Sequence, residues 1–207
     1  MSSRNKTQRD TACDLFRQTG LVRMRDLREA GVGAETVARL VREGVVMHVA
    51  RGLYQLADAM PDPRRSFAEA SALVPRGVIC LTSALQFHEL TLQMPSAVWI
   101  AIDRTGWKPK VEYPPIRFVR FGSQALREGV KRHLIEGIEV PIFEPAKTIV
   151  DCFRYRNKIG LDIALEGLRE GLHTKRATPD QLWEFARSAR VWSVMRPYVE
   201  AMVADGA

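Results

Sequence analysis

The length, composition and charge of the chain limit the kinds of protein it can be. It has 207 residues, of which 46% are hydrophobic, and this is enough to bury the core of one large domain or two small ones. Lys and Arg together number 31 against 24 Asp and Glu, so the net charge of +7 favours a polyanionic partner. No apolar run approaches the roughly 20 residues that a membrane helix needs, and Met1 to Asp10 contains no apolar signal-peptide core. We therefore expect a globular cytoplasmic protein with no membrane partner.

The first 56 residues predict three helices followed by a β-hairpin. Gly20, Gly31 and Gly44 each follow a stretch with helical periodicity and are expected to end it. Two β-rich runs then flank the short segment Ala50 to Gly52, which is typical of a hairpin. The predicted helices are Thr7–Gln18, Met24–Ala30 and Ala34–Glu43, and the predicted strands are Val45–Val49 and Leu53–Leu56. Three helices and a hairpin predict a winged helix-turn-helix.

A break in the pattern at Ala57 to Arg65 separates this region from the rest of the chain. Pro61 and Pro63 interrupt any helical or strand periodicity there, and the surroundings are charged. We expect a winged helix-turn-helix DNA-binding domain at residues 1–60 and a second domain at residues 66–207. The second domain is predicted to contain strands at Ala97–Asp103, Ile116–Phe121, Lys131–Leu134 and Ile138–Ile142, and helices at Ser66–Leu73, Ser83–Leu90, Pro145–Arg154, Leu161–Gly171, Pro179–Ala189 and Ser193–Val203. The expected fold class is α+β, with a small, mostly antiparallel sheet and a helical C-terminal third in the second domain.

The third predicted helix divides into an apolar face and a polar face, as a DNA-recognition helix must. Val37, Leu40 and Val41 recur at i, i+3 and i+4, so they are expected to face the core. Arginine can donate two hydrogen bonds to guanine, and a threonine methyl can contact thymine. A solvated, salt-bridged helix face would have the same composition and stays open as the alternative. The candidate DNA contacts on this helix are Glu35, Thr36, Arg39 and Arg42.

The predicted hairpin adds two further candidate contacts. Arg51 precedes Gly52 at the tip, which can hold a cation on an exposed turn beside the DNA backbone or minor groove. His48 lies on the first strand of the same hairpin. An exposed hairpin tip also prefers glycine and a charged residue without any DNA role. The helices and the basic hairpin together are more specific than either feature alone.

Several stretches of the chain resemble the AbiEi family of antitoxins and its transcriptional-regulator relatives. The resemblance covers Gly20 to Leu56, with its Arg-Leu-Val-Arg helix and Arg-Gly-Leu-Tyr hairpin, and more loosely Leu81 to Leu90, Val98 to Arg104 and Val140 to Arg154. It implies a DNA-binding repressor of its own operon that opposes a nucleotidyltransferase-like toxin without necessarily binding it, as the antitoxin of a type IV toxin–antitoxin system. The expected partner is double-stranded DNA, and whether two copies occupy adjacent half-sites on it stays open.

One position departs from the family pattern at the start of the second helix. Arg23 stands where such sequences often have a Ser or Thr cap, so this helix start loses a cap and gains a cation that can reach a phosphate. We include Arg23 and the neighbouring Arg25 among the candidate DNA contacts.

The alternative function is a nuclease-type second domain, and the residues fit it poorly. Asp103 ends a strand, but Glu144 and Lys147 are separated by two residues that include Pro145, instead of alternating on a strand as in restriction-type nucleases. Asp151 is expected to be buried and paired with an arginine such as Arg154.

Other catalytic and metal-binding patterns are also missing from the sequence. The four histidines form no metal-ligand pair, and His88 is expected to be a hydrogen-bonded core residue. The odd, widely spaced Cys13, Cys80 and Cys152 indicate free thiols and not a disulfide framework or a zinc site. We therefore expect no enzymatic activity, no catalytic residues, no metal and no cofactor.

Overall fold

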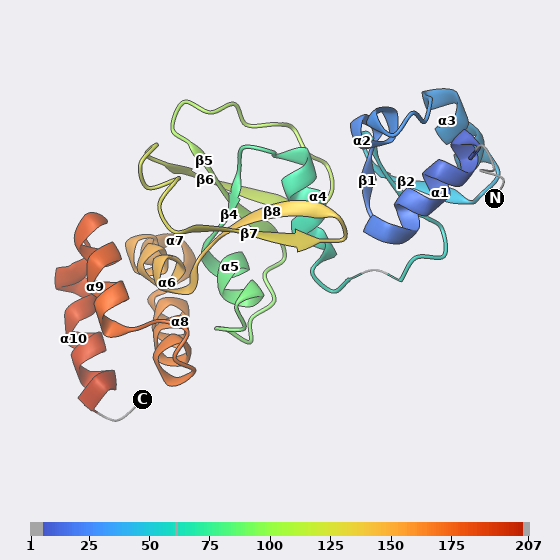
Figure 1. The fold of residues 1–207 in the computed structure, drawn as a ribbon. Coiled ribbons are helices and arrows are strands. Elements are labelled where there is room, and N and C mark those ends of the chain that lie inside the picture. The colour runs from blue at the N-terminus through green and yellow to red at the C-terminus, as the bar shows by residue number, and fades with distance from the viewer. Residues whose placement is uncertain (1–5, 61, 205–207) are drawn as a thin grey trace. The chain divides into compact units, whose positions relative to one another are not determined.

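The computed structural model describes residues 6–60 and 62–204, and its contacts divide the chain into two compact units. The first unit comprises Met1–Pro75 together with Leu134–Val140, and the second comprises Arg76–His133 together with Pro141–Ala207. The outer ends of the two predicted domains, residues 1–5 and 205–207, and Pro61 of the predicted linker lie outside the described residues. Figure 1 shows the elements of each unit.

The N-terminal unit contains the three predicted helices and the predicted hairpin. Their bounds differ from the predicted ones by at most a residue at either end. A short strand that was not predicted, Val22–Arg23, pairs with the second hairpin strand, and the resulting three-stranded sheet is antiparallel. The elements are α1 (Gln8–Thr19), β1 (Val22–Arg23), α2 (Met24–Glu29), α3 (Ala34–Arg42), β2 (Val46–Ala50), β3 (Leu53–Leu56) and α4 (Arg65–Leu73).

Local sequence explains where the first helix begins and what it buries. The Thr7 hydroxyl accepts a hydrogen bond from the Asp10 backbone N–H, and the Asp10 carboxylate accepts one from the Thr7 backbone N–H. This reciprocal capping fixes the start of α1. The core of the unit includes Val37 and Leu40, which were predicted to face it, together with Phe16, Leu27 and Val46.

A segment distant in sequence completes the N-terminal unit. Leu134–Val140 is the turn between β7 (Val130–Ile135) and β8 (Ile138–Phe143), and it clusters with the first unit. The carbonyl oxygen of Glu136 accepts a hydrogen bond from the Leu21 N–H at 3.1 Å, and its Oε1 accepts one from the Asp62 N–H at 2.7 Å. These contacts, with α4, extend the first unit past residue 60, where the sequence predicts the domain to end. The functional boundary between the two predicted domains stays a prediction.

The C-terminal unit is built on a five-stranded sheet in the order β6-β5-β4-β8-β7. The sheet contains both kinds of strand pair: β4 and β5 are antiparallel, whereas β4 and β8, and also β5 and β6, are parallel. The sheet is thus mixed, and not mostly antiparallel as expected. The long Arg104 to Pro115 connection allows this, because a return to the start of a parallel neighbour needs about a dozen residues. The remaining strands are β4 (Val78–Ile79), β5 (Val98–Asp103) and β6 (Ile116–Phe121).

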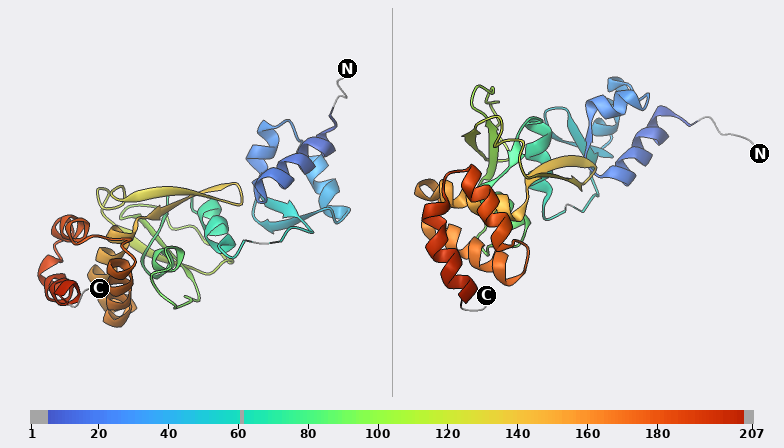
Figure 2. Two further views of the ribbon diagram at one scale, coloured as in Figure 1. Left: turned by 60° about the horizontal axis from the view of Figure 1, so that its bottom comes forward. Right: turned by 60° about the vertical axis from the view of Figure 1, so that its left-hand side comes forward.

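The helices of this unit bury one continuous core, which also includes side chains from β5, β6 and β8. Pro145 occupies the first turn of α6, and the Thr178 side chain caps α9. Pro197 lies inside the last helix, which begins at Trp192. Both views in Figure 2 show the last helices packed side by side. The helices are α5 (Leu81–Phe87), α6 (Pro145–Arg154), α7 (Arg156–Ile159), α8 (Leu161–His173), α9 (Pro179–Ser188) and α10 (Trp192–Ala204).

Candidate DNA-binding surface

The outer face of α3 carries the polar residues predicted for a recognition helix. Val37 and Leu40 are buried at 1% and 0% exposure, whereas Glu35, Arg39 and Arg42 are exposed. The division into two faces follows from the spacing of the apolar residues along one helical stripe. Three of the four predicted contacts on this helix are therefore available to a partner.

The fourth predicted residue on α3, Thr36, has a structural partner in α1. The Oε1 of Gln8 accepts hydrogen bonds from the Thr36 hydroxyl at 2.8 Å and from the Gly33 backbone N–H at 3.0 Å. One glutamine thus satisfies an otherwise unpaired N–H at the start of α3 and holds the Thr36 side chain, which is half-buried. Because the Thr36 hydroxyl is bonded to Gln8, the methyl group is the part of this side chain that can contact a base.

Arg39 and Glu43 form part of a surface charge network. The Arg39 Nε lies 3.9 Å from the Glu43 Oε1, and Glu43 also forms an ion pair with Arg9 of α1. The Arg39 side chain is 55% exposed, and an exposed pair of this kind contributes little to stability. Arg39 can leave Glu43 for a nucleic-acid partner at small cost.

Three of the predicted basic contacts line one hollow of about 240 Å³ in the N-terminal unit. Arg23 and Arg25 come from the start of α2, and Arg51 comes from the tip of the β2–β3 hairpin. The backbone N–H of Met24 donates a 2.8 Å hydrogen bond to the carbonyl oxygen of Gly52, which fixes the tip against the helix start. The arrangement brings together three cations that the sequence placed on two separate elements.

Arg23 occupies the N-cap position of α2 without acting as a side-chain cap. A guanidinium has no acceptor, so the capping is one-sided: the Asp26 carboxylate accepts a 3.3 Å hydrogen bond from the Arg23 backbone N–H. The Arg23 Nε is buried with no hydrogen-bond partner among the described residues. Burial, and next the charge of Arg25, lower the pKa of the Arg23 guanidinium.

His48, the remaining candidate, lies on the exposed side of β2. Its ring packs against Tyr54 of β3 with the ring centroids 5.1 Å apart. The ring contact orients His48 and leaves its nitrogens free to approach a groove or a phosphate. Gln8 was not identified from the sequence as a supporting residue, because its contacts join α1 to α3, which is distant along the chain.

The residues considered for nuclease chemistry have structural partners. The Asp103 carboxylate accepts hydrogen bonds from Ser123 at 2.6 Å and from Thr105 at 2.9 Å, and Glu144 pairs with Lys131 at 3.8 Å. Among residues 6–60 and 62–204, no cluster of three or more potential metal ligands occurs. None of the helices in this part of the chain has the length and apolar character to cross a bilayer.

The buried polar groups of the C-terminal unit support one sequence prediction and correct another. His88 is in the core with its Nε2 2.8 Å from the carbonyl oxygen of Phe143, as expected. Asp151 is buried, but its partner is Lys147 and not Arg154, because Lys147 lies one turn earlier on the same helix and faces the core with it. Cys13, Cys80 and Cys152 are free thiols, and Cys13 is only half-buried.

Residues 14–57 match the model of a family described as transcriptional regulator, AbiEi antitoxin. The matched segment contains all eight predicted contacts, including the three arginines that line the hollow. The matched family is the one that this segment of the sequence resembles, and its description names a transcriptional regulator. No curated protein matches the chain.

Proposed function

We propose that the chain is a sequence-specific transcriptional repressor and the autoregulating antitoxin of a type IV toxin–antitoxin system. In this proposal the N-terminal unit is a winged helix-turn-helix. The helix α3 enters the major groove, the start of α2 contacts phosphates, and the β2–β3 hairpin is the wing. The observation that carries the proposal is the hollow in which Arg23, Arg25 and Arg51 meet, because three cations at one place suit a phosphate backbone. The Arg25 Nε also lies 3.1 Å from the Asp26 carboxylate, an exposed pair that a phosphate can replace at small cost.

The roles of the basic residues differ and can be separated by experiment. Arg39 and Arg42 on α3 are proposed to reach base edges, whereas Arg25 and Arg51 are proposed to hold phosphates. Loss of a base contact costs about 1–3 kcal/mol on the cognate site only, whereas loss of a phosphate contact weakens binding on every sequence. The same substitutions therefore test which residues read sequence.

The direct test is fluorescence anisotropy with a fragment of the chain's own promoter and an unrelated duplex of equal length. We expect Arg39→Ala to weaken promoter binding alone and Arg51→Ala to weaken binding to both duplexes. Arg17→Ala is the matched control, since Arg17 is an exposed arginine of α1 outside the hollow. Promoter affinity that is unchanged in both the Arg39 and the Arg51 variants would reject the proposed surface.

We also propose that the protein opposes a nucleotidyltransferase-like toxin and is not itself an enzyme. The partners found for Asp103 and Glu144 support this, because a metal-dependent nuclease needs converging carboxylates that are free to bind a cation. Plasmid DNA incubated with the purified chain and Mg²⁺ or Mn²⁺ should stay intact. Cleavage that is abolished by Asp103→Ala would establish the nuclease alternative.

The antitoxin role has its own test. The gene next to that of this chain should encode the toxin, and co-expression of the full chain should restore the growth of cells arrested by that toxin. A variant with weakened promoter binding, such as Arg51→Ala, should still restore growth if the C-terminal unit performs the neutralisation. If the full chain binds the promoter but does not restore growth, the repressor role stands and the antitoxin role is rejected.

A further inference from the structure

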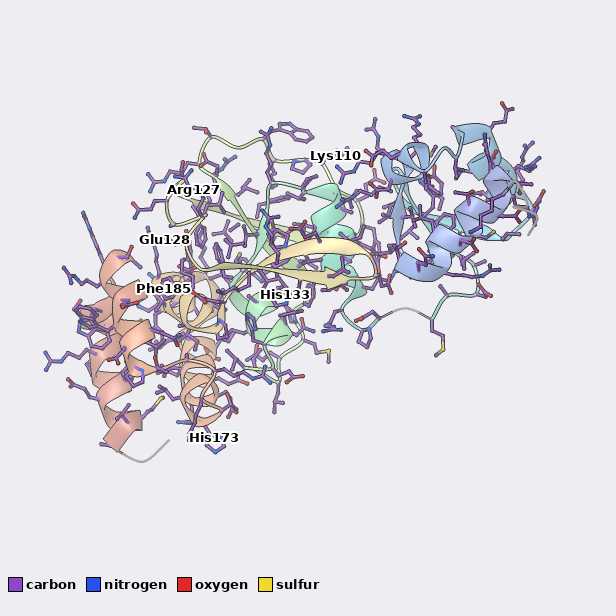
Figure 3. The ribbon with its side chains drawn as sticks, viewed as in Figure 1. Lys110, Arg127, Glu128, His133, His173 and Phe185 are labelled. Atoms are coloured by element: carbon purple, nitrogen blue, oxygen red, sulfur yellow. The ribbon has the colours of Figure 1, made fainter. Side chains whose placement is uncertain are left out.

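The C-terminal unit contains a polar cavity that the DNA-binding function does not use. Its volume is about 330 Å³, which is within the range of about 300–1,000 Å³ usual for small-molecule sites. The lining residues come from the ends of β5 and β6, the segment before β7, and the helices α6 and α9. Glu128 and Phe185, two of these residues, are labelled in Figure 3.

Positive charge dominates the lining of this cavity. Arg104 and Arg154 are both exposed, and neither guanidinium forms an ion pair with any of the residues that the structure describes. The ammonium group of Lys147 lies in the buried wall of the cavity, where it forms an ion pair with the carboxylate of Asp151. Guanidinium groups bind phosphate and carboxylate through paired hydrogen bonds, so two unpaired arginines at one cavity suit an anionic group.

The rest of the lining suits a ring-bearing molecule. Phe185 of α9 is half-buried, and with Ala125 and Ala189 it supplies an apolar wall. The Glu128 carboxylate accepts a 2.7 Å hydrogen bond from the Gln124 side chain and a longer one, 3.4 Å, from the Ser188 hydroxyl, and its remaining lone pairs can accept from an amino or hydroxyl group. An aromatic face, an acceptor and two arginines are the groups that recognise the base, the sugar and the phosphate of a nucleotide.

We propose that this cavity binds a small phosphate monoester bearing a flat ring, of the size of a mononucleotide. Arg104 and Arg154 hold the phosphate, and Phe185 packs against the ring. Glu128 accepts a hydrogen bond from the sugar or the base. A terminal phosphate can enter between the two arginines from one side. A phosphodiester within a duplex is flanked by nucleotides on both sides, which disfavours a DNA backbone as the occupant.

The test is isothermal titration calorimetry of the full chain with adenosine monophosphate, adenosine and inorganic phosphate as probes. We expect the monophosphate to bind and adenosine to bind at least tenfold more weakly. Arg104→Met and Arg154→Met should each weaken monophosphate binding at least tenfold. Arg169→Met, the matched control at an exposed arginine of α8 outside the cavity, should change it less than twofold.

Further variants separate the parts of the proposal. Phe185→Leu should weaken binding of the monophosphate but not of inorganic phosphate. Arg104→Lys keeps the charge but loses the paired donors, so its affinity should lie between those of the wild type and Arg104→Met. Circular dichroism melts confirm that each variant is folded before titration.

Three results would overturn the proposal. The first is the absence of monophosphate binding by the folded wild-type chain. The second is an equal loss of affinity in Arg169→Met, which would indicate a general effect of net charge. The third is displacement of the monophosphate by a short duplex of unrelated sequence whose own affinity falls in Arg104→Met and Arg154→Met. That result would assign the two arginines to a nucleic-acid backbone.

Discussion

At the scale of single residues, the buried ion pair of Lys147 and Asp151 is the most unusual feature of the C-terminal unit. The Asp151 Oδ2 accepts from the Lys147 ammonium, whereas its Oδ1 is buried without a hydrogen-bond partner among the described residues. The ammonium also lies 4.6 Å from the centroid of the Phe143 ring and 5.1 Å from that of Phe121. Desolvation by burial outweighs the attraction of Lys147 and raises the pKa of Asp151 to about 6.

This pKa predicts that the pair makes the fold less stable as the pH rises from 4 to 7. The carboxyl group titrates near 3.8 in the unfolded chain and about 6 in the folded one, so between these values the folded state binds more protons. The contribution of Asp151 to the free energy of unfolding is fully present below about pH 4 and is lost as the pH rises through 6. It amounts to roughly 3 kcal/mol, at 1.36 kcal/mol per pKa unit. Lys147, Arg154 and Glu128 are the charged groups that act on Asp151, and their charges are included in this pKa.

Urea unfolding at several pH values between 4 and 7.5 measures this contribution. The control is the double variant Lys147→Met with Asp151→Leu, which replaces the pair by apolar side chains of similar size. We expect the wild-type stability to fall relative to that of the double variant as the pH rises. Parallel curves for the two proteins would show that Asp151 does not titrate in this range.

Sequence predicted the burial or exposure of a residue correctly where these depend only on which face of a helix the residue occupies. The burial of Val37 and Leu40 and the exposure of Arg39 follow from helical spacing alone. The partner of Asp151 was mispredicted even though Lys147 lies four residues earlier, the spacing at which helical side chains meet. No spacing rule reveals the cavity residues Arg104 and Arg154, because they meet only after distant elements pack.

At the scale of elements, the turn between β7 and β8 depends on a glycine. Gly137 has a φ of +75°, and a Cβ there would lie 2.4 Å from the Thr19 Cβ and 2.7 Å from the Thr19 carbonyl oxygen. Any side chain must therefore displace the end of α1. The same turn holds the Leu21 N–H and the Asp62 N–H through Glu136.

We predict that Gly137→Ala destabilises the N-terminal unit by about 2–4 kcal/mol, the sum of left-handed strain and overpacking. Gly44→Ala is the matched control, because Gly44 has a φ of +71° but nothing within 4 Å of its added Cβ. That variant should lose only about 1 kcal/mol. Thermal melts of both variants measure the two losses of stability. Equal losses would mean that the turn rearranges to accommodate the added methyl group.

The sequence predicted most helices and strands but missed the shortest ones. Val22–Arg23, Val78–Ile79 and Arg156–Ile159 are two to four residues long, too short for a periodic pattern to appear. The two short strands exist because they pair with strands distant along the chain, Val22 with Tyr54 and Ile79 with Ile142. Strand direction in the sheet was mispredicted for the same reason, since it depends on long-range pairing.

At the scale of the whole molecule, the predicted linker can be tested by truncation. A fragment ending at Asp62 retains the core around Leu27, Val37 and Leu40 and all eight predicted DNA contacts. It lacks Glu136, which bonds to Leu21 and Asp62 in the full chain. We predict that the fragment folds and binds DNA but melts at a lower temperature than the full chain. Circular dichroism and promoter titration check this, and a fragment without a cooperative melt would contradict it.

The Glu136 turn also affects how the protein is made. The N-terminal unit consists of two chain segments, Met1–Pro75 and Leu134–Val140, so its last contacts cannot form when Pro75 leaves the ribosome. Roughly 65 further residues must be synthesised, which takes about 3–13 s at the usual rate of about 5–20 residues per second. During this interval Leu21 and Asp62 lack their partner from Glu136. The nascent protein therefore passes through a stage in which the predicted DNA-binding residues have been made but the unit that holds them is unfinished.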